Sequence, residues 1–455
     1  MSNNTLNSVF ARYDILGESI YIDKRNGNFS SSYEELVEFP FSEVEPAPKY
    51  SNDLYRCVTF CLEISDACNL KCSYCFNENK TGKKMSFEEA EGCLNYLFKF
   101  FNKAERYFID VSGCGEPLLN LKLINQIADY AKRKSNEIDR EIVVSFVTNG
   151  TLLSEEVVRF LQKMGILFGV SLDGNKLVHD SHRQFVNGAG TYSSITRNVS
   201  AIDHREYLGC AVTITKEVFP LLPALQELNR YFSTISVKPV RSEEWGIDEE
   251  SCLAWLKEYE ELEHYLEQRV SLGDTSLLFC LLNGADYFGK FILRSFLGIK
   301  ALSRCDGATG RVGVSINGSF YPCIAMIGSN EKLGDMESGF DFRSAKQFYD
   351  GQIVRDDCKC CDFRFLCGGE CAVERNEHNG LNNMMCSFKK ELILLSMVFE
   401  EHCRYFGDDI YDRIINFCVE KRKRTMENPL LRKYRDSHKD LTFVEARERF
   451  YDAKE

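Results

Sequence analysis

Short apolar runs alternate with longer amphipathic stretches from about residue 57 to residue 240. The runs are rich in β-branched and aromatic residues, whereas the stretches between them repeat their apolar positions at helical spacing. The strand-like runs are CVTFCLEI, YFIDVSG, IVVSFVTNG, FGVSLDG, CAVTIT and ISVKPVR. This alternation predicts βα units that build a parallel sheet. We therefore expect an α/β fold, a partial (β/α)6 barrel of the TIM type.

The segments on either side of the barrel have different patterns. Strand-like runs at 11–16 and 18–23 precede an Asn-Gly turn near the start of the chain, which predicts a small hairpin. Residues 300–390 are rich in Cys and Gly and poor in periodic runs. We expect five parts: a hairpin appendage at 1–56, the barrel at 57–245, a helical bridge at 246–300, a small cysteine-organised domain at 301–390 and C-terminal helices at 391–455. The last part is expected to end in a charged, solvated tail at 432–455.

Composition and charge exclude several classes of partner. The chain has 455 residues, a net charge of -12 and 44% hydrophobic residues, so no broad positive field would attract nucleic acid or an anionic membrane. The first residues do not combine a basic stretch with an apolar run, and no apolar run reaches the roughly 18 residues of a membrane span. These features predict a cytoplasmic protein without nucleic-acid or membrane partners.

Cysteine is unusually abundant, with twenty residues in the chain. Disulfides at this density are typical of short secreted domains, so metal thiolates explain the number better in a long chain without a signal sequence. Ten cysteines fall in closely spaced groups, and most of the others are expected to be small buried hydrophobic residues. The scattered ones are Cys57, Cys61, Cys93, Cys114, Cys210, Cys252, Cys280, Cys360, Cys403 and Cys418.

Three cysteines lie on one loop directly after the first predicted strand. Cys68, Cys72 and Cys75 form the motif CNLKCSYC. Three thiolates can hold three irons of a 4Fe-4S cubane and leave the fourth iron open to a ligand. The structural alternative is a zinc site that lacks its fourth ligand.

This loop resembles the CxxxCxxC signature of the radical S-adenosylmethionine (SAM) enzymes, with the aromatic residues Tyr74 and Phe76 beside it. The resemblance implies a 4Fe-4S cluster whose open iron binds the amino and carboxyl groups of the methionine part of SAM. It extends to the segment GCGEPLL, where Gly115, Glu116 and Pro117 match the GGEP segment of the family. Backbone approach together with one carboxylate would suit the ammonium group of SAM.

Two further segments resemble SAM-contacting parts of that family. VSLDGNKLVHDSHR is similar to the segment that supplies a serine and an arginine to SAM, here Ser171 and Arg183. The TNG turn places Thr148 and Asn149 as contact candidates, with a purely structural turn as the alternative. All these segments follow predicted strands at their carboxyl ends, where α/β barrels place their active sites.

Seven cysteines downstream resemble the SPASM domain of radical SAM enzymes that modify peptides and proteins. The resemblance implies two auxiliary 4Fe-4S clusters, which makes three clusters in the chain, and two zinc ribbons are the alternative. One auxiliary cluster would use Cys358, Cys361, Cys367 and Cys386, and the other Cys305, Cys323 and Cys371. The second set has three thiolates for four irons, so that cluster has an open site or takes another ligand such as Cys280. Cys360 has no assigned role.

The resemblance implies a radical SAM peptide maturase that abstracts a hydrogen atom from a ribosomally made peptide and forms a cross-link. We expect a thioether, because an open auxiliary site could bind a substrate thiolate. The alternative is the oxidation of a protein Cys or Ser to formylglycine, as in anaerobic sulfatase maturases. Those enzymes place an aspartate directly after the second auxiliary cysteine, where this chain has Ile324. An iron-sulfur electron carrier or scaffold without catalysis is a third class.

Substrate recognition is the least specified part of the prediction. The expected partners are a peptide or protein substrate and an electron donor such as flavodoxin or ferredoxin. Lys238 and Arg241, at the end of the sixth strand, are candidates to bind a carboxylate of the substrate or of SAM, with a surface salt bridge as the alternative. Residues 1–56 look too short and too strand-rich for the leader-binding module of many peptide maturases. No catalytic side chain is assigned, and neither the substrate nor the oligomeric state follows from the sequence.

Overall fold

The computed structural model describes residues 3–5, 8–39, 41, 43–44, 46–77, 80–202, 208–353, 358–377 and 381–424. The predicted charged tail at 432–455 lies outside the described residues. The chain divides into two compact units, which we call the barrel unit and the helical unit. The barrel unit is Lys49–Gly246 with Asp306–Gly351, and the helical unit is Met1–Pro48, Ile247–Cys305 and Gln352–Glu455.

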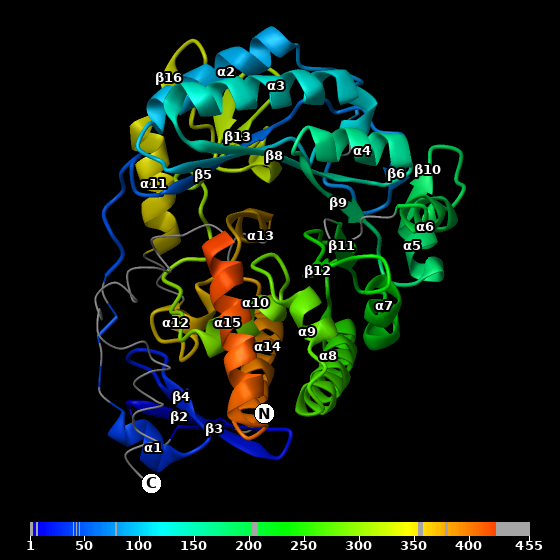
Figure 1. Ribbon diagram of the computed structural model, residues 1–455. Helices are drawn as coiled ribbons and strands as arrows, with labels where there is room; N and C mark the ends of the chain where they lie inside the picture. The colour runs from blue at the N-terminus through cyan, green and yellow to red at the C-terminus, as the bar shows by residue number, and fades with distance from the viewer. Residues whose placement is uncertain are drawn as a thin grey trace. The chain divides into compact units, whose positions relative to one another are not determined.

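Parallel strands form most of the large sheet of the barrel unit, which confirms the predicted α/β class (Figure 1). In order across the sheet they are β12 (Thr234–Pro239), β11 (Gly209–Ile214), β9 (Leu167–Ser171), β8 (Glu141–Thr148), β7 (Arg106–Asp110) and β5 (Cys57–Leu62). Each of these strands coincides with one of the six predicted runs. β5 is buried along its whole length because it has a parallel neighbour on both sides.

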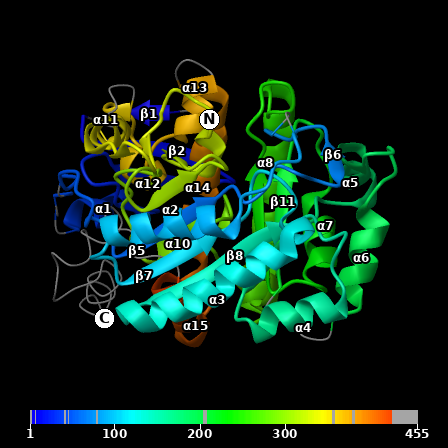
Figure 2. The ribbon, with the colours of Figure 1, turned by 90° about the horizontal axis from the view of Figure 1, so that it is seen from above.

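Helices connect the parallel strands, and α2, α3 and α4 lie on the same face of the sheet (Figures 1 and 2). The helices of this part are α2 (Phe87–Phe100), α3 (Leu121–Ile138), α4 (Glu155–Lys163), α5 (Lys176–His182), α6 (Tyr192–Ser200) and α7 (Leu221–Leu228). Ser86 and Glu89 form a capping box that satisfies backbone N–H groups at the start of α2. Ile124 and Ile127 of α3 are fully buried, so the apolar side of the helix faces the core.

Residues from the cysteine-rich stretch extend this sheet beyond β5. Their strands are β13 (Arg311–Val314), β14 (Ser319–Tyr321), β15 (Gly334–Asp335) and β16 (Gly339–Phe340), followed by α11 (Phe342–Ile353). β13 pairs in parallel with β5, whereas the three strands after it are antiparallel. The predicted part at 301–390 therefore contributes residues to both compact units.

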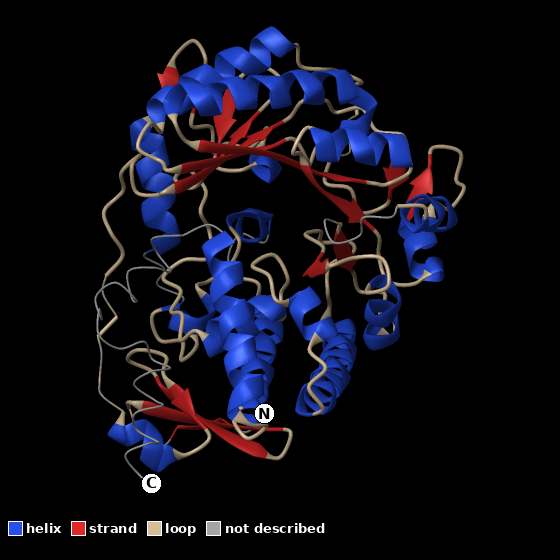
Figure 3. Cartoon of the chain, in the orientation of Figure 1, coloured by secondary structure: helices blue, strands red, loops and turns tan. Residues whose placement is uncertain are grey.

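The N-terminal strands of the helical unit form a four-stranded antiparallel sheet with α1 beside it (Figure 3). Its elements are β1 (Asn3–Thr5), β2 (Phe10–Ile15), β3 (Glu18–Asp23), β4 (Phe29–Ser30) and α1 (Tyr33–Glu38). The strands predicted at 11–16 and 18–23 are confirmed as β2 and β3, which pair as a hairpin.

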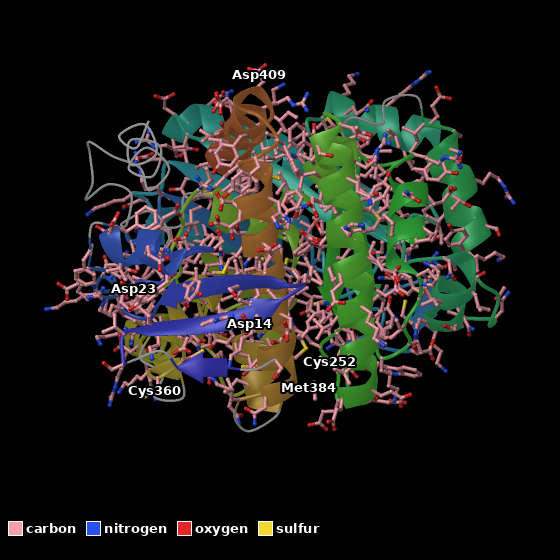
Figure 4. The ribbon with its side chains drawn as sticks, turned by 90° about the horizontal axis from the view of Figure 1, so that it is seen from below. Asp14, Asp23, Cys252, Cys360, Met384 and Asp409 are labelled. Carbon is pink, nitrogen blue, oxygen red and sulfur yellow. The ribbon has the colours of Figure 1, made fainter. Side chains whose placement is uncertain are left out.

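Two long helices, α8 (Glu249–Ser271) and α14 (Asn383–Cys403), pack side by side in the helical unit (Figure 4). Cys252 and Met384, near the start of each helix, lie at the same end in Figure 4, so the two helices run in the same direction. Tyr259 of α8 contacts Phe388 of α14 edge to face, with ring centroids 5.8 Å apart. The other helices are α9 (Ser276–Leu281), α10 (Gly289–Phe296), α12 (Arg364–Cys367), α13 (Ala372–Glu377) and α15 (Asp408–Arg424).

Candidate active site

The loop after β5 carries Cys68, Cys72 and Cys75, and all three side chains are partly buried. Burial raises the pKa of Cys72 to about 11, Arg183 lowers it, and the neighbouring thiols of Cys75 and Cys68 raise it further. Cys68 and Cys75 thus act electrostatically on the thiol of Cys72. The backbone N–H of Leu70 also donates to the Cys68 sulfur over 3.4 Å. Three gathered thiols with an N–H donor fit the thiolate ligands of a cubane cluster with one open iron.

A short strand joins this loop to the predicted arginine. β6 (Leu70–Cys72) pairs antiparallel with β10 (Arg183–Phe185), and Arg183 lies directly opposite Cys72. The guanidinium of Arg183 also lies over the Tyr74 ring, 5.3 Å from its centroid. Two segments more than a hundred residues apart in the sequence are thus held in register beside the three cysteines.

Asp173 is a completely buried carboxylate that organises this region. It accepts hydrogen bonds from Arg183 Nε at 2.6 Å, from the Tyr74 hydroxyl and from the Thr213 backbone N–H at 2.8 Å. Burial acts to raise the pKa of Asp173, but the positive charge of Arg183 together with the hydrogen bonds from Arg183 and Tyr74 holds that pKa below the usual value. Sequence reasoning missed Asp173, because an Asp-Gly pair after a strand is usual in a turn.

Glu116 ties the GEP segment to the TNG turn. Its buried carboxylate accepts from Thr148 Oγ1 at 2.5 Å, from the Asn149 backbone N–H at 2.7 Å and from the Leu118 backbone N–H at 3.1 Å. Three internal donors therefore occupy the carboxylate predicted to face an ammonium group. We infer that Glu116 positions the two turns.

The other residues predicted to contact SAM belong to the same compact unit. A Cβ atom on Gly115 would be 2.3 Å from the carbonyl oxygen of Ala67, so only glycine allows the segment to pack on the cysteine loop. Pro117 begins a short 3-10 helix, and Ser171 ends β9. Phe76 is about half exposed, at 53%.

His182 and its neighbours form a group that sequence reasoning did not identify. His182 Nδ1 lies 2.7 Å from the hydroxyl of Ser73, inside the CSYC motif, and its Nε2 lies 3.2 Å from a carboxylate oxygen of Glu217. Trp245 contacts the imidazole edge to face at 4.9 Å. Only the fold joins these residues, which come from the cysteine loop, from α5 and from the ends of β11 and β12.

His179 is a buried neutral imidazole behind Asp173. Its Nδ1 accepts from the Asp173 backbone N–H at 3.1 Å, and its Nε2 lies 2.8 Å from Thr191 Oγ1, so the hydrogen bonds assign the Nε2–H tautomer. Burial lowers the pKa of His179 to about 4. In the unfolded chain the pKa returns to the usual 6.5, so the unfolded state binds more protons between these two values.

Lowering the pH from about 7 to about 5 is therefore expected to cost about 2 kcal/mol of stability through His179. Thermal unfolding of the wild type and of His179→Gln at both pH values measures this effect, and the variant should lose less stability on acidification. The exposed His264 provides the matched control, His264→Gln, which should lose as much as the wild type. Equal losses in all three proteins would contradict the assignment.

Four cysteines of the helical unit gather in the same way as the first three. Burial raises the pKa of Cys386 to about 11, and the nearby thiols of Cys367 and Cys358 act in the same direction. Cys367 and Cys358 likewise raise the pKa of Cys361, for which burial is again the largest cause. These electrostatic effects link the four cysteines of the first predicted auxiliary set, and their role as cluster ligands stays a prediction.

The second auxiliary set is divided between the two compact units. Cys305 and Cys371 belong to the helical unit, and Cys371 raises the pKa of the buried Arg304. Cys323 belongs to the barrel unit, where it directly precedes a short 3-10 helix, Ile324–Met326. Cys280 is buried on α9. This set and its fourth ligand therefore stay a prediction.

The remaining sequence predictions concern single residues. Lys238 is exposed on β12, and Arg241 follows that strand. All the scattered cysteines are buried except Cys360, which is exposed, as Figure 4 also indicates. No helix in the described part of the chain is both long and apolar enough to span a membrane.

Comparisons with known proteins agree with this site. Residues 62–215 match the model of the radical SAM superfamily. An uncharacterized protein of Archaeoglobus fulgidus is 27% identical over 84% of this chain and 92% of its own length. The cysteine-type anaerobic sulfatase-maturating enzyme of Clostridium perfringens is 26% identical over 72% of this chain and 92% of its own. The structure of a histidine-tagged anSMEcpe with bound AdoMet shares the fold, with a TM-score of 0.62 and 22% identity over 79% of this chain and 98% of its own.

The matched segment contains the three-cysteine loop, the GEP and TNG turns and the Asp173–Arg183 pair. Residues 62–215 therefore form a radical SAM domain, as the three-cysteine loop predicts. The similarity to a sulfatase-maturating enzyme agrees with the maturase class predicted from the cysteine spacing.

Proposed function

We propose that this enzyme carries three 4Fe-4S clusters and modifies a peptide or protein by abstracting a hydrogen atom and forming a cross-link, specifically a thioether. The observation that carries the proposal is the register of Cys72 with Arg183, which gathers the cysteine loop and the Asp173 network at one end of the barrel sheet. The likeness to sulfatase-maturating enzymes over 72% of the chain supports a peptide or protein substrate.

The first cluster, when bound by Cys68, Cys72 and Cys75, supplies the electron that cleaves SAM into methionine and a 5'-deoxyadenosyl radical. The side chains of the protein hold the cysteine loop and the neighbouring turns in position. Asp173 fixes the guanidinium of Arg183 with two contacts, 2.6 and 3.3 Å long, beside the loop. Glu116 fixes the GEP and TNG turns. A rigid, largely buried surround of this kind keeps water from a reactive radical.

Formation of the proposed cross-link removes one hydrogen atom, one proton and one electron from the substrate. The substrate carbon gives one hydrogen atom to the 5'-deoxyadenosyl radical, and a substrate cysteine loses its thiol proton. When the carbon and the sulfur join, one electron is released and needs an acceptor. The auxiliary clusters would supply that acceptor. Cys358, Cys361, Cys367 and Cys386 are proposed to hold one of them, and Cys305, Cys323 and Cys371 the other.

Oxidation of a protein Cys or Ser to formylglycine is the second candidate, because sulfatase-maturating enzymes of both the cysteine and the serine type are similar to this chain. Formylglycine formation also needs a base, and the position after Cys323 holds an apolar side chain. Ile324 packs at Gly113, where an added Cβ would be 3.1 Å from it. The pair His182–Glu217, which lies beside Ser73 of the cysteine loop, would be a candidate base.

Substrate and electron-donor contacts complete the proposal. Lys238 and Arg241 are proposed to bind a carboxylate of the substrate or of SAM, because Lys238 lies near the carboxyl end of β12 and Arg241 follows that strand. A flavodoxin or a ferredoxin is proposed as the electron donor.

Anaerobic incubation of the reduced enzyme with SAM and candidate peptides tests this proposal. The candidates are peptides synthesised from short cysteine-bearing reading frames beside the gene, and a cysteine peptide derived from a sulfatase. A thioether product loses two hydrogen atoms and its thiol no longer reacts with iodoacetamide. Formylglycine instead replaces sulfur by oxygen, loses two hydrogens and reacts with a hydrazide. Release of 5'-deoxyadenosine without either change in any peptide would contradict the proposal.

A further inference from the structure

Two acidic side chains and one histidine meet in the helical unit, where the buried Cys403 directly follows the histidine in sequence. Glu263 and Glu267 stand one turn apart on α8, and His402 lies near the end of α14. One oxygen of each carboxylate and one imidazole nitrogen all lie within 4.8 Å of one another. Donor atoms about 2.1 Å from a common ion lie about 3 to 4 Å apart, so sub-ångström movements would complete such a site.

The hydrogen bonds of the described residues do not explain why the carboxylate of Glu263 is buried. The residue is only 1% exposed, and its Oε1 has no hydrogen-bond partner among the described residues. A buried carboxylate without a partner is costly, and proteins usually neutralise it by a proton, a cation or a metal. Burial raises the pKa of Glu263 to about 8, and the negative charge of Glu267 acts in the same direction. No cationic side chain is among the groups that shift this pKa.

The imidazole of His402 faces the carboxylates in the way a metal ligand would. Its Nδ1 lies 3.2 Å from Glu267 Oε1, yet Nδ1 also has no hydrogen-bond partner in the described part of the chain. The two atoms thus point toward a shared space rather than along a hydrogen bond. On the other side of the ring, Nε2 lies 3.8 Å from a carboxylate oxygen of Glu18 on β3. Metal-bound histidines commonly direct their second nitrogen to such a carboxylate.

We propose that Glu263, Glu267 and His402 bind a divalent transition-metal ion, of the class of Mn²⁺, Fe²⁺ or Zn²⁺, and that Glu18 orients His402. The donor set of two carboxylates and one imidazole suits this class of ion. The ion offsets the charge of the buried carboxylate and links α8 to α14. It is separate from the iron-sulfur clusters because none of its ligands is a cysteine. Its role is to stabilise the helical unit, since an ion bound only by the folded state raises stability.

Mn²⁺ is the probe that separates this site from the thiols, because manganese prefers oxygen and nitrogen ligands. The full chain with reconstituted, oxidised clusters is titrated with Mn²⁺, and loss of the free-ion electron paramagnetic resonance signal measures binding. We expect one Mn²⁺ per wild-type chain, displaced by Zn²⁺. Glu263→Gln and His402→Gln should each weaken binding by at least roughly tenfold.

The matched control is Glu261→Gln, which removes an exposed carboxylate from the same helix and should bind Mn²⁺ like the wild type. Mn²⁺ should also raise the thermal unfolding midpoint of the wild type and of the control, but not of Glu263→Gln. Because His402 is partly exposed, its variant remains informative if Glu263→Gln folds poorly. Equal Mn²⁺ binding by the wild type, Glu263→Gln and His402→Gln, or no binding by the wild type, would overturn the proposal.

Discussion

Replacing Asp173 by alanine is expected to lower the free energy of unfolding by about 3–5 kcal/mol, because it leaves the buried Arg183 guanidinium without its charge partner. The same substitution removes the acceptor for the Tyr74 hydroxyl and for the Thr213 backbone N–H. Arg183 lies opposite Cys72, so the cysteine loop should lose its register with β10 as well. We expect weaker SAM binding together with the lower stability. Chemical denaturation and equilibrium dialysis with SAM measure the two effects.

An exposed ion pair in the same unit provides the control. Arg159 and Glu155 pair at the surface of α4, where each side chain is about half exposed or more, so Glu155→Ala should change stability by less than about 1 kcal/mol. Asp173→Asn, which keeps the shape but not the charge, should lie between the wild type and Asp173→Ala. If Asp173→Ala were as stable as Glu155→Ala and bound SAM like the wild type, the central role of Asp173 would be wrong.

The second large effect concerns the iron content. If three 4Fe-4S clusters are present, the reconstituted enzyme should hold about twelve irons per chain, and the variant lacking Cys68, Cys72 and Cys75 about eight. A variant lacking Cys358, Cys361, Cys367 and Cys386 should also lose about four irons but keep the cluster that binds SAM. Iron analysis with Mössbauer spectroscopy distinguishes these losses from general unfolding.

Cys360 offers the matched control for that series, since it is exposed and lies between two of the proposed ligands in sequence. Cys360→Ala should keep the full iron content. A stable wild-type enzyme with only about four irons would contradict the two auxiliary clusters.

The barrel could be predicted from the sequence because each of its strands and helices has a local pattern of apolar and polar residues. Runs such as CVTFCLEI and IVVSFVTNG became β5 and β8, and the segments after them became the site. The extension of the sheet by β13 could not be predicted. Its parallel partner β5 lies about 250 residues earlier, and the short run Arg311–Val314 carries no signal for that pairing.

Some residues of the site could likewise be predicted from a local sequence pattern, and others could not. Cysteine spacing is a local signal, so it predicts Cys68, Cys72 and Cys75 as cluster ligands directly. Asp173 gains its role only from Arg183, Tyr74 and Thr213, which reach it through three different segments of the fold. Glu116 could be identified from its motif. The motif does not reveal, however, that internal donors occupy its carboxylate.

The central claim is that the loop after β5 makes this protein a radical SAM enzyme, and SAM cleavage tests it most directly. The reconstituted, chemically reduced protein is incubated with SAM under anaerobic conditions, and 5'-deoxyadenosine is quantified by liquid chromatography and mass spectrometry. We expect 5'-deoxyadenosine from the wild type and from Cys360→Ala, and none above background from Cys68→Ala. Formation of no 5'-deoxyadenosine by the cluster-loaded wild type, or equal formation by Cys68→Ala, would contradict the assignment.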